Sequence, residues 1–210
     1  MGMMPVRNNK KKALNLYTRQ RGASLIEFMT ASMLSLIALA AVGSVFISGQ
    51  KLAAERSKQL LLMQNLSDTL KYVKEDIKRA GYQKSGGGSA ILSGASNVIH
   101  TWPTGLSYVY ENQGGQLQVV SFKQRDSGGK KVVSLCEDST SPVLVIDSCS
   151  GYTSMLDQHQ IKLMKFEVQT TPLGNGVSSA LVTMTISGQL RGDSSVTKTM
   201  SATIKQRNWQ

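Results

Sequence analysis

Residues 28–47 constrain this chain more than any other stretch, because FMTASMLSLIALAAVGSVFI is long, apolar and free of charge. At about 1.5 Å of rise per residue, a helix over this stretch spans roughly 30 Å, the thickness of a bilayer's hydrocarbon core. The sequence therefore predicts one membrane-spanning helix near the N-terminus. The remainder of the 210 residues is long enough for one modest domain with its own core.

The formal net charge of +11 is concentrated before this segment. Residues 1–22 contain no acidic residue and six basic ones: Arg7, Lys10, Lys11, Lys12, Arg19 and Arg21. By the positive-inside rule, this leader stays in the cytoplasm and everything after about Gln50 lies outside. Of the 24 basic and 13 acidic residues, 18 basic and 13 acidic ones remain after the leader. Such a small surplus is typical of a solvated surface and does not by itself indicate nucleic-acid binding.

Three fates compete for the apolar segment. A cleaved secretory signal is one, since ALAA at 38–41 offers a small-x-small site, and an uncleaved signal anchor is another. The third is a prepilin signal, which is cut on the cytoplasmic side so that the apolar helix stays in the mature chain. Glu27 favours the third, because a carboxylate inside an ordinary signal's apolar region is costly to insert.

The stretch RQRG followed by ASLIEFMTASMLSLIALAAVGSVF resembles the N-terminal motif of type IV pilins and type II secretion pseudopilins. The resemblance implies that prepilin peptidase cuts after Gly22 and N-methylates the new N-terminus, Ala23. Glu27 falls on the motif's glutamate, the fifth residue of the mature chain. Ala23 departs from the family, which most often has phenylalanine or methionine there.

The resemblance also suggests a role for Glu27. Alone in a membrane or a filament core, its carboxylate is an unpartnered charge. In an assembled filament, the Ala23 amine of a neighbouring subunit would pair with it and set the axial register between subunits. Without the motif, an interfacial glutamate that has no partner would be the simpler interpretation.

Strong helix formers continue without proline after the apolar segment. Residues 51–83 predict an amphipathic periplasmic helix whose apolar stripe is Leu62, Leu66, Leu70, Val73 and Ile77. Gly81 is a good C-terminal cap, so one helix is expected from about Ala23 to Ala80. Residues 23–50 form its transmembrane and filament-core part, and Gly43 and Ser44 mark the point most open to local bending.

Residues 84–210 change to short alternating segments and predict an antiparallel β domain. LSYVY and QLQVVSF flank NQGG, which indicates a hairpin, and ALVTMTISGQL and SVTKTMSATIK flank RGDSS, which indicates another. A turn explains Arg191-Gly192-Asp193 without any adhesive partner. The expected fold class is thus α+β and pilin-like, with a long N-terminal helix packed on an antiparallel β-sheet.

Cys136 and Cys149 are the chain's two cysteines. No CxxC motif or histidine pair accompanies them, so they fit no zinc pattern. One disulfide that closes a short loop suits an oxidising compartment, whereas two free thiols would suit the cytosol. The predicted topology favours the disulfide.

Nothing in the sequence invites a catalytic, metal or cofactor assignment. His100 and His159 are far apart, and neither stands beside a nucleophile or metalloprotease motif. Trp102, Tyr108 and Tyr110 would allow an aromatic patch for stacking on bases, although such residues more often fill a core. A non-enzymatic protein without a cofactor is therefore expected.

Within the pilin superfamily, DIKRAGYQ and SATIKQRN resemble PilW-like minor pilins, J-type minor pseudopilins and prepilin peptidase-dependent protein B. The resemblance implies a low-abundance subunit that initiates, primes or caps a filament. Its partners would be other minor and major pilins, prepilin peptidase and an inner-membrane assembly platform. It would cross the inner membrane once and then enter a pilus or pseudopilus near the tip. Two alternatives stay open, a J-type pseudopilin of type II secretion and a pilus-tip module that binds DNA or a surface.

Overall fold

A computed structural model describes residues 24–84, 88–139, 149, 151–173 and 180–205. The chain divides into two compact units, Met1–Gln50 and Lys51–Gln210. The predicted cleavage site, Gly22 and Ala23, lies outside the described residues.

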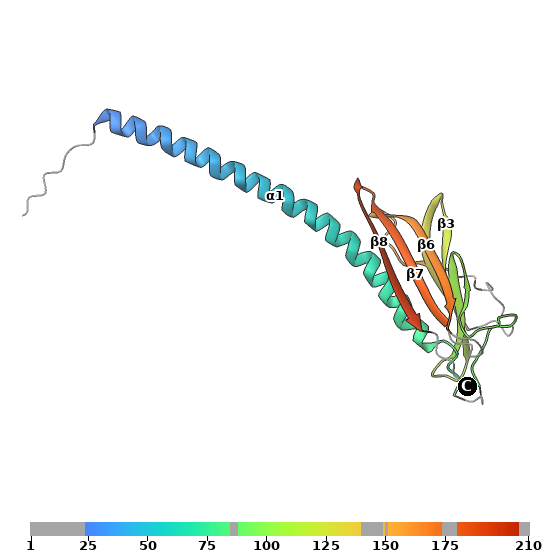
Figure 1. The fold of residues 1–210 in the computed structure, drawn as a ribbon. Helices are drawn as coiled ribbons and strands as arrows, with labels where there is room; N and C mark the ends of the chain where they lie inside the picture. The colour runs from blue at the N-terminus through green and yellow to red at the C-terminus, as the bar shows by residue number, and fades with distance from the viewer. Residues whose placement is uncertain (1–23, 85–87, 140–148, 150, 174–179, 206–210) are drawn as a thin grey trace, which may run out of the picture. The chain divides into compact units, whose positions relative to one another are not determined.

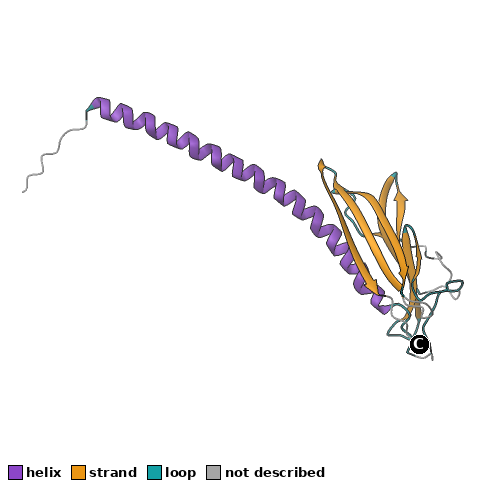
Figure 2. Ribbon diagram, viewed as in Figure 1, coloured by secondary structure: helices purple, strands orange, loops and turns teal. Residues whose placement is uncertain are grey.

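One helix dominates the first part of the chain. Helix α1 runs over Leu25–Asp76, and a short 3-10 helix, η1, follows at Ile77–Arg79 (Figure 2). The helix continues through Gly43 without a break in its hydrogen-bonded pattern. It stops where expected, because Gly81 adopts φ +78°, a left-handed conformation that glycine reaches at little cost. The Gly81 N–H then donates to the carbonyl of Val109 at 2.8 Å, which ties the helix end to a strand.

Five strands form the first antiparallel sheet, in the order β1-β2-β3-β4-β5. The hairpin predicted at NQGG is present: Asn112 accepts two backbone N–H bonds, from Gly114 at 2.9 Å and Gln116 at 3.0 Å, with its Oδ1. Gly115, at φ +75°, completes this turn. The strands are β1 (His100–Trp102), β2 (Gly105–Glu111), β3 (Leu117–Ser127), β4 (Lys130–Asp138) and β5 (Thr153–Ser154).

Three longer strands form a second antiparallel sheet in the order β6-β7-β8. Buried and half-buried residues alternate along β7, the central strand, as a one-sided sheet requires. The α+β fold class is confirmed, but the strands divide into two sheets rather than one. Isolated bonds join them, such as Val168 N–H to the carbonyl of Pro103 at 3.0 Å. The strands are β6 (Ile161–Pro172), β7 (Ala180–Leu190) and β8 (Asp193–Lys205).

The core of the unit Lys51–Gln210 lies between the helix and both sheets. All five residues of the predicted apolar stripe are buried, none more than 3% exposed. Gly188 on β7 leaves room for the helix, since a Cβ there would lie only 3.0 Å from Leu66 and 3.4 Å from Leu62. Tyr72 meets Phe122 of β3 edge to face, with ring centroids 6.3 Å apart. Within this unit, the β6–β8 sheet lies beside the later turns of α1 (Figure 1).

A polar network closes the core at the C-terminal end of the helix. Asp76 is buried, accepts a hydrogen bond from the hydroxyl of Tyr108 and forms an ion pair with Arg79. The Arg79 guanidinium also lies 4.4 Å from the ring centroid of Tyr110 and donates to its hydroxyl at 2.9 Å. Burial raises the pKa of both tyrosines, and that of Tyr108 lies well above its usual range. Tyr108 and Tyr110 are thus core residues and not an exposed stacking surface.

Candidate functional site: the first helical turns and the disulfide loop

Glu27 lies in the first turn of α1, and its side chain turns back toward the start of the helix. The backbone N–H of Ser24 donates to Glu27 Oε2 at 3.2 Å. A Ser-x-x-Glu sequence at this position is one half of a capping box, in which the glutamate satisfies an otherwise free N–H of the first turn. A carboxylate also suits the positive end of the helix dipole. In the part of the chain that the structure describes, Glu27 Oε1 accepts no hydrogen bond.

This local partner of Glu27 was missed by the sequence argument, which treated the carboxylate as unpartnered. The signal was present in SLIE, residues 24–27, because serine followed three residues later by glutamate is the capping-box pattern. The capping bond uses one carboxylate oxygen and leaves the charge in place. Pairing with an amine from another subunit therefore remains chemically open to Oε1.

Apolar side chains surround the following turns on every face. Large hydrophobic residues from Leu25 to Ile47 are exposed in the single chain, among them Leu25, Phe28, Leu34, Ile37 and Phe46. Helix α1 is the one candidate membrane span among the described residues. Four of the five hydroxyl groups between Leu25 and Gln50 donate to carbonyls within the helix. Thr30, for example, donates to the carbonyl of Glu27 at 3.0 Å, and Ser44 to that of Ala41 at 2.9 Å. Such internal bonding is what a helix in lipid requires, because hydrocarbon offers no partner.

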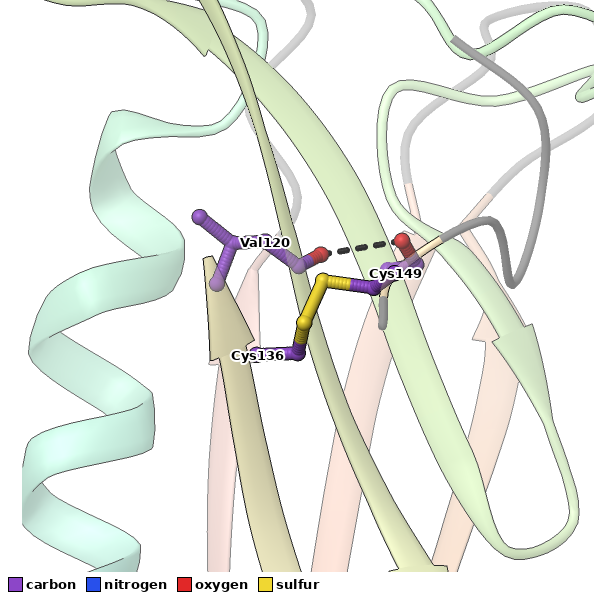
Figure 3. The surroundings of a disulfide bond; sticks show 4 residues. Val120, Cys136 and Cys149 are labelled. Atoms are coloured by element: carbon purple, nitrogen blue, oxygen red, sulfur yellow. Dashed lines mark hydrogen bonds between the residues drawn. A yellow bond between two sulfur atoms is a disulfide. The ribbon is translucent and has the colours of Figure 1, made fainter. Parts of the chain in front are cut away.

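A disulfide joins Cys136 on β4 to Cys149, thirteen residues further along the chain, with their Cα atoms 6.0 Å apart. Both cysteines are buried, and the bond lies next to Val120 of β3 (Figure 3). In the chain-entropy account, a loop of this length restricts the unfolded chain enough to add about 3 kcal/mol to the free energy of unfolding. The bond therefore links Cys149 covalently to strand β4 of the first sheet.

The two histidines lie apart in different settings. His100 is half-buried on β1, with its ring centroid 5.7 Å from that of Trp102, whereas His159 is exposed in a turn before β6. Among the described residues, no group of three or more His, Cys, Asp or Glu side chains is arranged to hold a metal ion.

Asp193 of the RGD sequence is occupied by contacts within the chain. Its Oδ1 accepts hydrogen bonds from the hydroxyl of Ser195 at 2.6 Å and from the Ser195 N–H at 3.2 Å. Its Oδ2 lies 2.9 Å from the ammonium of Lys58 on α1. The hydrogen bond from Ser195, followed by that from Lys58, lowers the pKa of Asp193 to about 2. The turn explanation of this tripeptide thus has a structural basis.

Comparison with known protein families gives one match. The family of prepilin peptidase-dependent protein B matches residues 55–206, which is most of the chain and includes both sheets. The chain belongs to the prepilin peptidase-dependent protein B family. This family membership confirms the predicted relation to PilW-like, pilin-type proteins. No curated protein and no solved structure shows a significant match.

The matched region begins after the apolar segment, so it is independent of the RQRGASLIE motif. Two separate parts of the chain therefore indicate the same class of protein: the N-terminal motif through its residues and residues 55–206 through the family. A pilin-like, pilus-related protein associated with a membrane through its N-terminal helix follows from the two together.

Proposed function

We propose that this prepilin peptidase-dependent protein is a minor pilin, a structural subunit that initiates, primes or caps a type IV pilus. It is inserted in the inner membrane with residues 1–22 in the cytoplasm and the domain after Gln50 in the periplasm. Prepilin peptidase removes the leader after Gly22 and methylates Ala23. The observation that supports this proposal most strongly is the position of Glu27. It caps the first turn of α1, directly before the apolar segment, in a chain of this family.

Assembly in this proposal depends on the first turn of α1. Cleavage after Gly22 places a new amine at Ala23, one residue before the capped N–H of Ser24. The apolar helix then leaves lipid and packs against the helices of other minor and major pilins on the assembly platform. Glu27 Oε1 faces the amine of a neighbouring subunit, and in that dry setting either charge alone is costly. The pair therefore favours one axial offset between subunits.

A J-type pseudopilin of a type II secretion system would use the same first turn, so this geometry serves either filament. Membership of the prepilin peptidase-dependent protein B family supports the choice of a pilus subunit. The role is structural, and the proposed mechanism requires no cofactor.

Intact-mass measurement of the membrane-extracted protein tests this proposal. Expressed with prepilin peptidase, the chain is expected to begin at Ala23 and to carry one additional methyl group. Expressed without the peptidase, it should retain all 210 residues apart from initiator-methionine processing. Gly22→Val is the matched variant that should stay uncut in both backgrounds. A mature chain that begins near Ala40 or Ala41 would refute the proposal, because ordinary signal cleavage removes Glu27 and the helix around it.

A further inference from the structure

Four basic side chains surround one shallow concavity on the unit Lys51–Gln210. The concavity measures about 270 Å³ and lies where the β3–β4 hairpin meets the first residues of β6 and the turn after β7. Its exposed basic residues are Lys130, Lys131, Lys162 and Arg191. We call these four residues the basic cluster.

The basic cluster carries an excess of positive charge. Asp126 is the one carboxylate among the residues that line the concavity, so the local balance is four basic groups against one acidic group. Within the described residues, Lys130, Lys131 and Lys162 form no ion pair within 4.0 Å. Three lysine ammonium groups are thus available to an anionic partner.

Contacts of Arg191 and of the nearby Asp193 show at which end of this unit the basic cluster lies. Arg191 donates from its backbone N–H to the carbonyl of Gln160 and from Nε to that of Gln158, at 2.8 and 2.7 Å. Two residues later, Asp193 pairs with Lys58 on α1. The basic cluster therefore lies at the end of the unit where its helix enters, opposite the Asp76–Arg79 network near the helix's C-terminus.

The chain enters this end of the unit directly from the apolar segment. From Ile47, the last residue of the apolar segment, to Lys58, the helix rises about 16 Å. Ten residues, Ser48 to Ser57, therefore separate the apolar segment from Lys58 along the chain. A connection this short tethers the basic cluster to the membrane and raises the local concentration of lipid headgroups around it. Exposed Lys51 and Arg56 lie on the intervening turns.

We propose that the basic cluster binds anionic phospholipid headgroups of the leaflet from which α1 emerges. The inference rests on the proposed single-pass anchoring, which tethers the domain to the membrane. Phospholipid headgroups are a better candidate for the anionic partner than nucleic acid, because the membrane anchor keeps headgroups at high local concentration around the domain. Headgroup contact restrains the domain before assembly and is given up when the subunit leaves the membrane.

The first experiment uses the full-length protein in proteoliposomes made of phosphatidylcholine alone or mixed with phosphatidylglycerol. A water-soluble amine reagent labels the lysines, and peptide mapping gives the rate at each one. Phosphatidylglycerol is expected to slow labelling of Lys130, Lys131 and Lys162 by about threefold or more, and high salt should restore it. Lys71, also exposed but thirteen residues beyond Lys58 on α1, is the internal control and should label equally in both membranes.

The second experiment separates the cluster from the membrane span. Full-length wild type and two variants are taken from detergent micelles doped with phosphatidylglycerol, and the retained lipids are counted by native mass spectrometry. The variant Lys130→Gln/Lys131→Gln/Lys162→Gln should retain fewer anionic lipids, by about fivefold for each charge lost at full contact. The matched control Lys71→Gln/Lys74→Gln/Lys84→Gln should behave as wild type.

Each other outcome overturns the inference. Equal labelling in the two membranes, or equal lipid retention by both triple variants, would show that the cluster does not contact headgroups. Protection of the three lysines by a short DNA duplex and not by phosphatidylglycerol would show that the basic cluster binds nucleic acid instead of lipid. Resistance of the full chain to carbonate extraction reports the anchor separately, so a failed anchor is distinguishable from a failed cluster.

Discussion

Glu27 has two carboxylate oxygens in different situations, and this difference separates two effects of a single residue. Oε2 caps the first turn of α1 through the Ser24 N–H, whereas Oε1 accepts no bond in the described part of the chain. Capping needs an acceptor at this position, and glutamine supplies one as well as glutamate does. Pairing with a neighbour's amine needs the negative charge. Substitutions at one position therefore distinguish the cap from the ion pair.

Replacement of Glu27 is expected to impair incorporation into filaments through loss of charge. Glu27→Gln keeps the cap but leaves the neighbour's Ala23 amine buried without a counter-charge, a cost of about 3–5 kcal/mol. Incorporation, measured by immunoblot of sheared pili, should fall at least tenfold for Glu27→Gln and Glu27→Ala, with Glu27→Asp between them and wild type.

Ser32→Ala provides the control, since among the described residues the Ser32 hydroxyl donates to the carbonyl of Met29, within the same helix, and has no other bond. That variant should assemble normally. If Glu27→Gln assembles as well as wild type while Glu27→Ala does not, the residue acts as a helix cap and the register role is wrong.

At the residue scale, the features that could be predicted from the sequence were those that depend on residues close together in the chain. The stripe from Leu62 to Ile77 and the glycine at position 81 could be predicted because helix periodicity and a left-handed cap are local properties. The burial of Asp76 could not be predicted in this way. Its carboxylate is paired with the hydroxyl of Tyr108 on β2, and these two residues are thirty-two positions apart in the sequence. Sequence periodicity carries no information about such a partner.

Among the elements, the β7–β8 hairpin is attached to the helix at a defined point. Its turn places Asp193 opposite Lys58, and the Ser195 hydroxyl orients the same carboxylate. Both groups are partly exposed, so solvent screening keeps the contribution modest. The arrangement nonetheless makes the attachment sensitive to acid.

The pH dependence follows from the direction of the pKa shift. Hydrogen bonds from Ser195 and Lys58 lower the pKa of Asp193 from 3.8 to about 2 in the folded chain. A lowered carboxyl pKa stabilises the folded state above the unfolded pKa, and this contribution is lost as the pH falls from about 4 to 2. The Tm of wild type should therefore exceed that of Asp193→Asn at pH 6, and the difference should shrink toward pH 2.

Thermal unfolding of the full chain in detergent, followed by circular dichroism, measures this difference. Asp126→Asn is the matched control, because Asp126 is exposed at the tip of the β3–β4 hairpin and forms no ion pair within the described residues. Its Tm should stay within error of wild type over the same pH range. A difference between wild type and Asp193→Asn that does not change with pH would contradict the assignment.

Hairpins were predictable and the division into two sheets was not. NQGG and RGDSS each predict a local turn, and both hairpins are present. Whether β4 pairs with β6 depends on chain segments far apart in sequence, and alternation of polar and apolar residues has the same period in either arrangement. The two sheets are instead joined where the Phe166 N–H donates to Gln124 Oε1 at 3.1 Å and where Val168 meets Pro103.

For the whole molecule, the predicted membrane orientation depends on where the basic residues lie in the sequence and not on the net charge. Six basic residues lie before the apolar segment and four more gather in the basic cluster, on the other side of that segment. The positive-inside rule explains how both can exist, because residues close to the span set orientation and distant domains are translocated largely regardless of charge. The leader charges are therefore predicted to orient the chain.

The disulfide provides a reporter for this orientation. It forms in an oxidising compartment, whereas a domain retained in the cytoplasm would keep Cys136 and Cys149 reduced. Replacing all six basic residues of the leader by glutamine removes the orientation signal. We expect wild type to show almost no thiol labelling under denaturing conditions, and the variant to show both thiols labelled in about half of the molecules or more.

The control for this experiment is Lys130→Gln/Lys131→Gln/Lys162→Gln, which removes positive charge from the domain and leaves the leader intact. Its cysteines should remain fully oxidised, since these lysines lie more than eighty residues beyond the apolar segment. Complete oxidation of the leader variant would contradict the predicted orientation, because the disulfide would then form without the charges that direct the domain outward. Labelling in both variants would instead show that net charge, not its position, governs translocation of this chain.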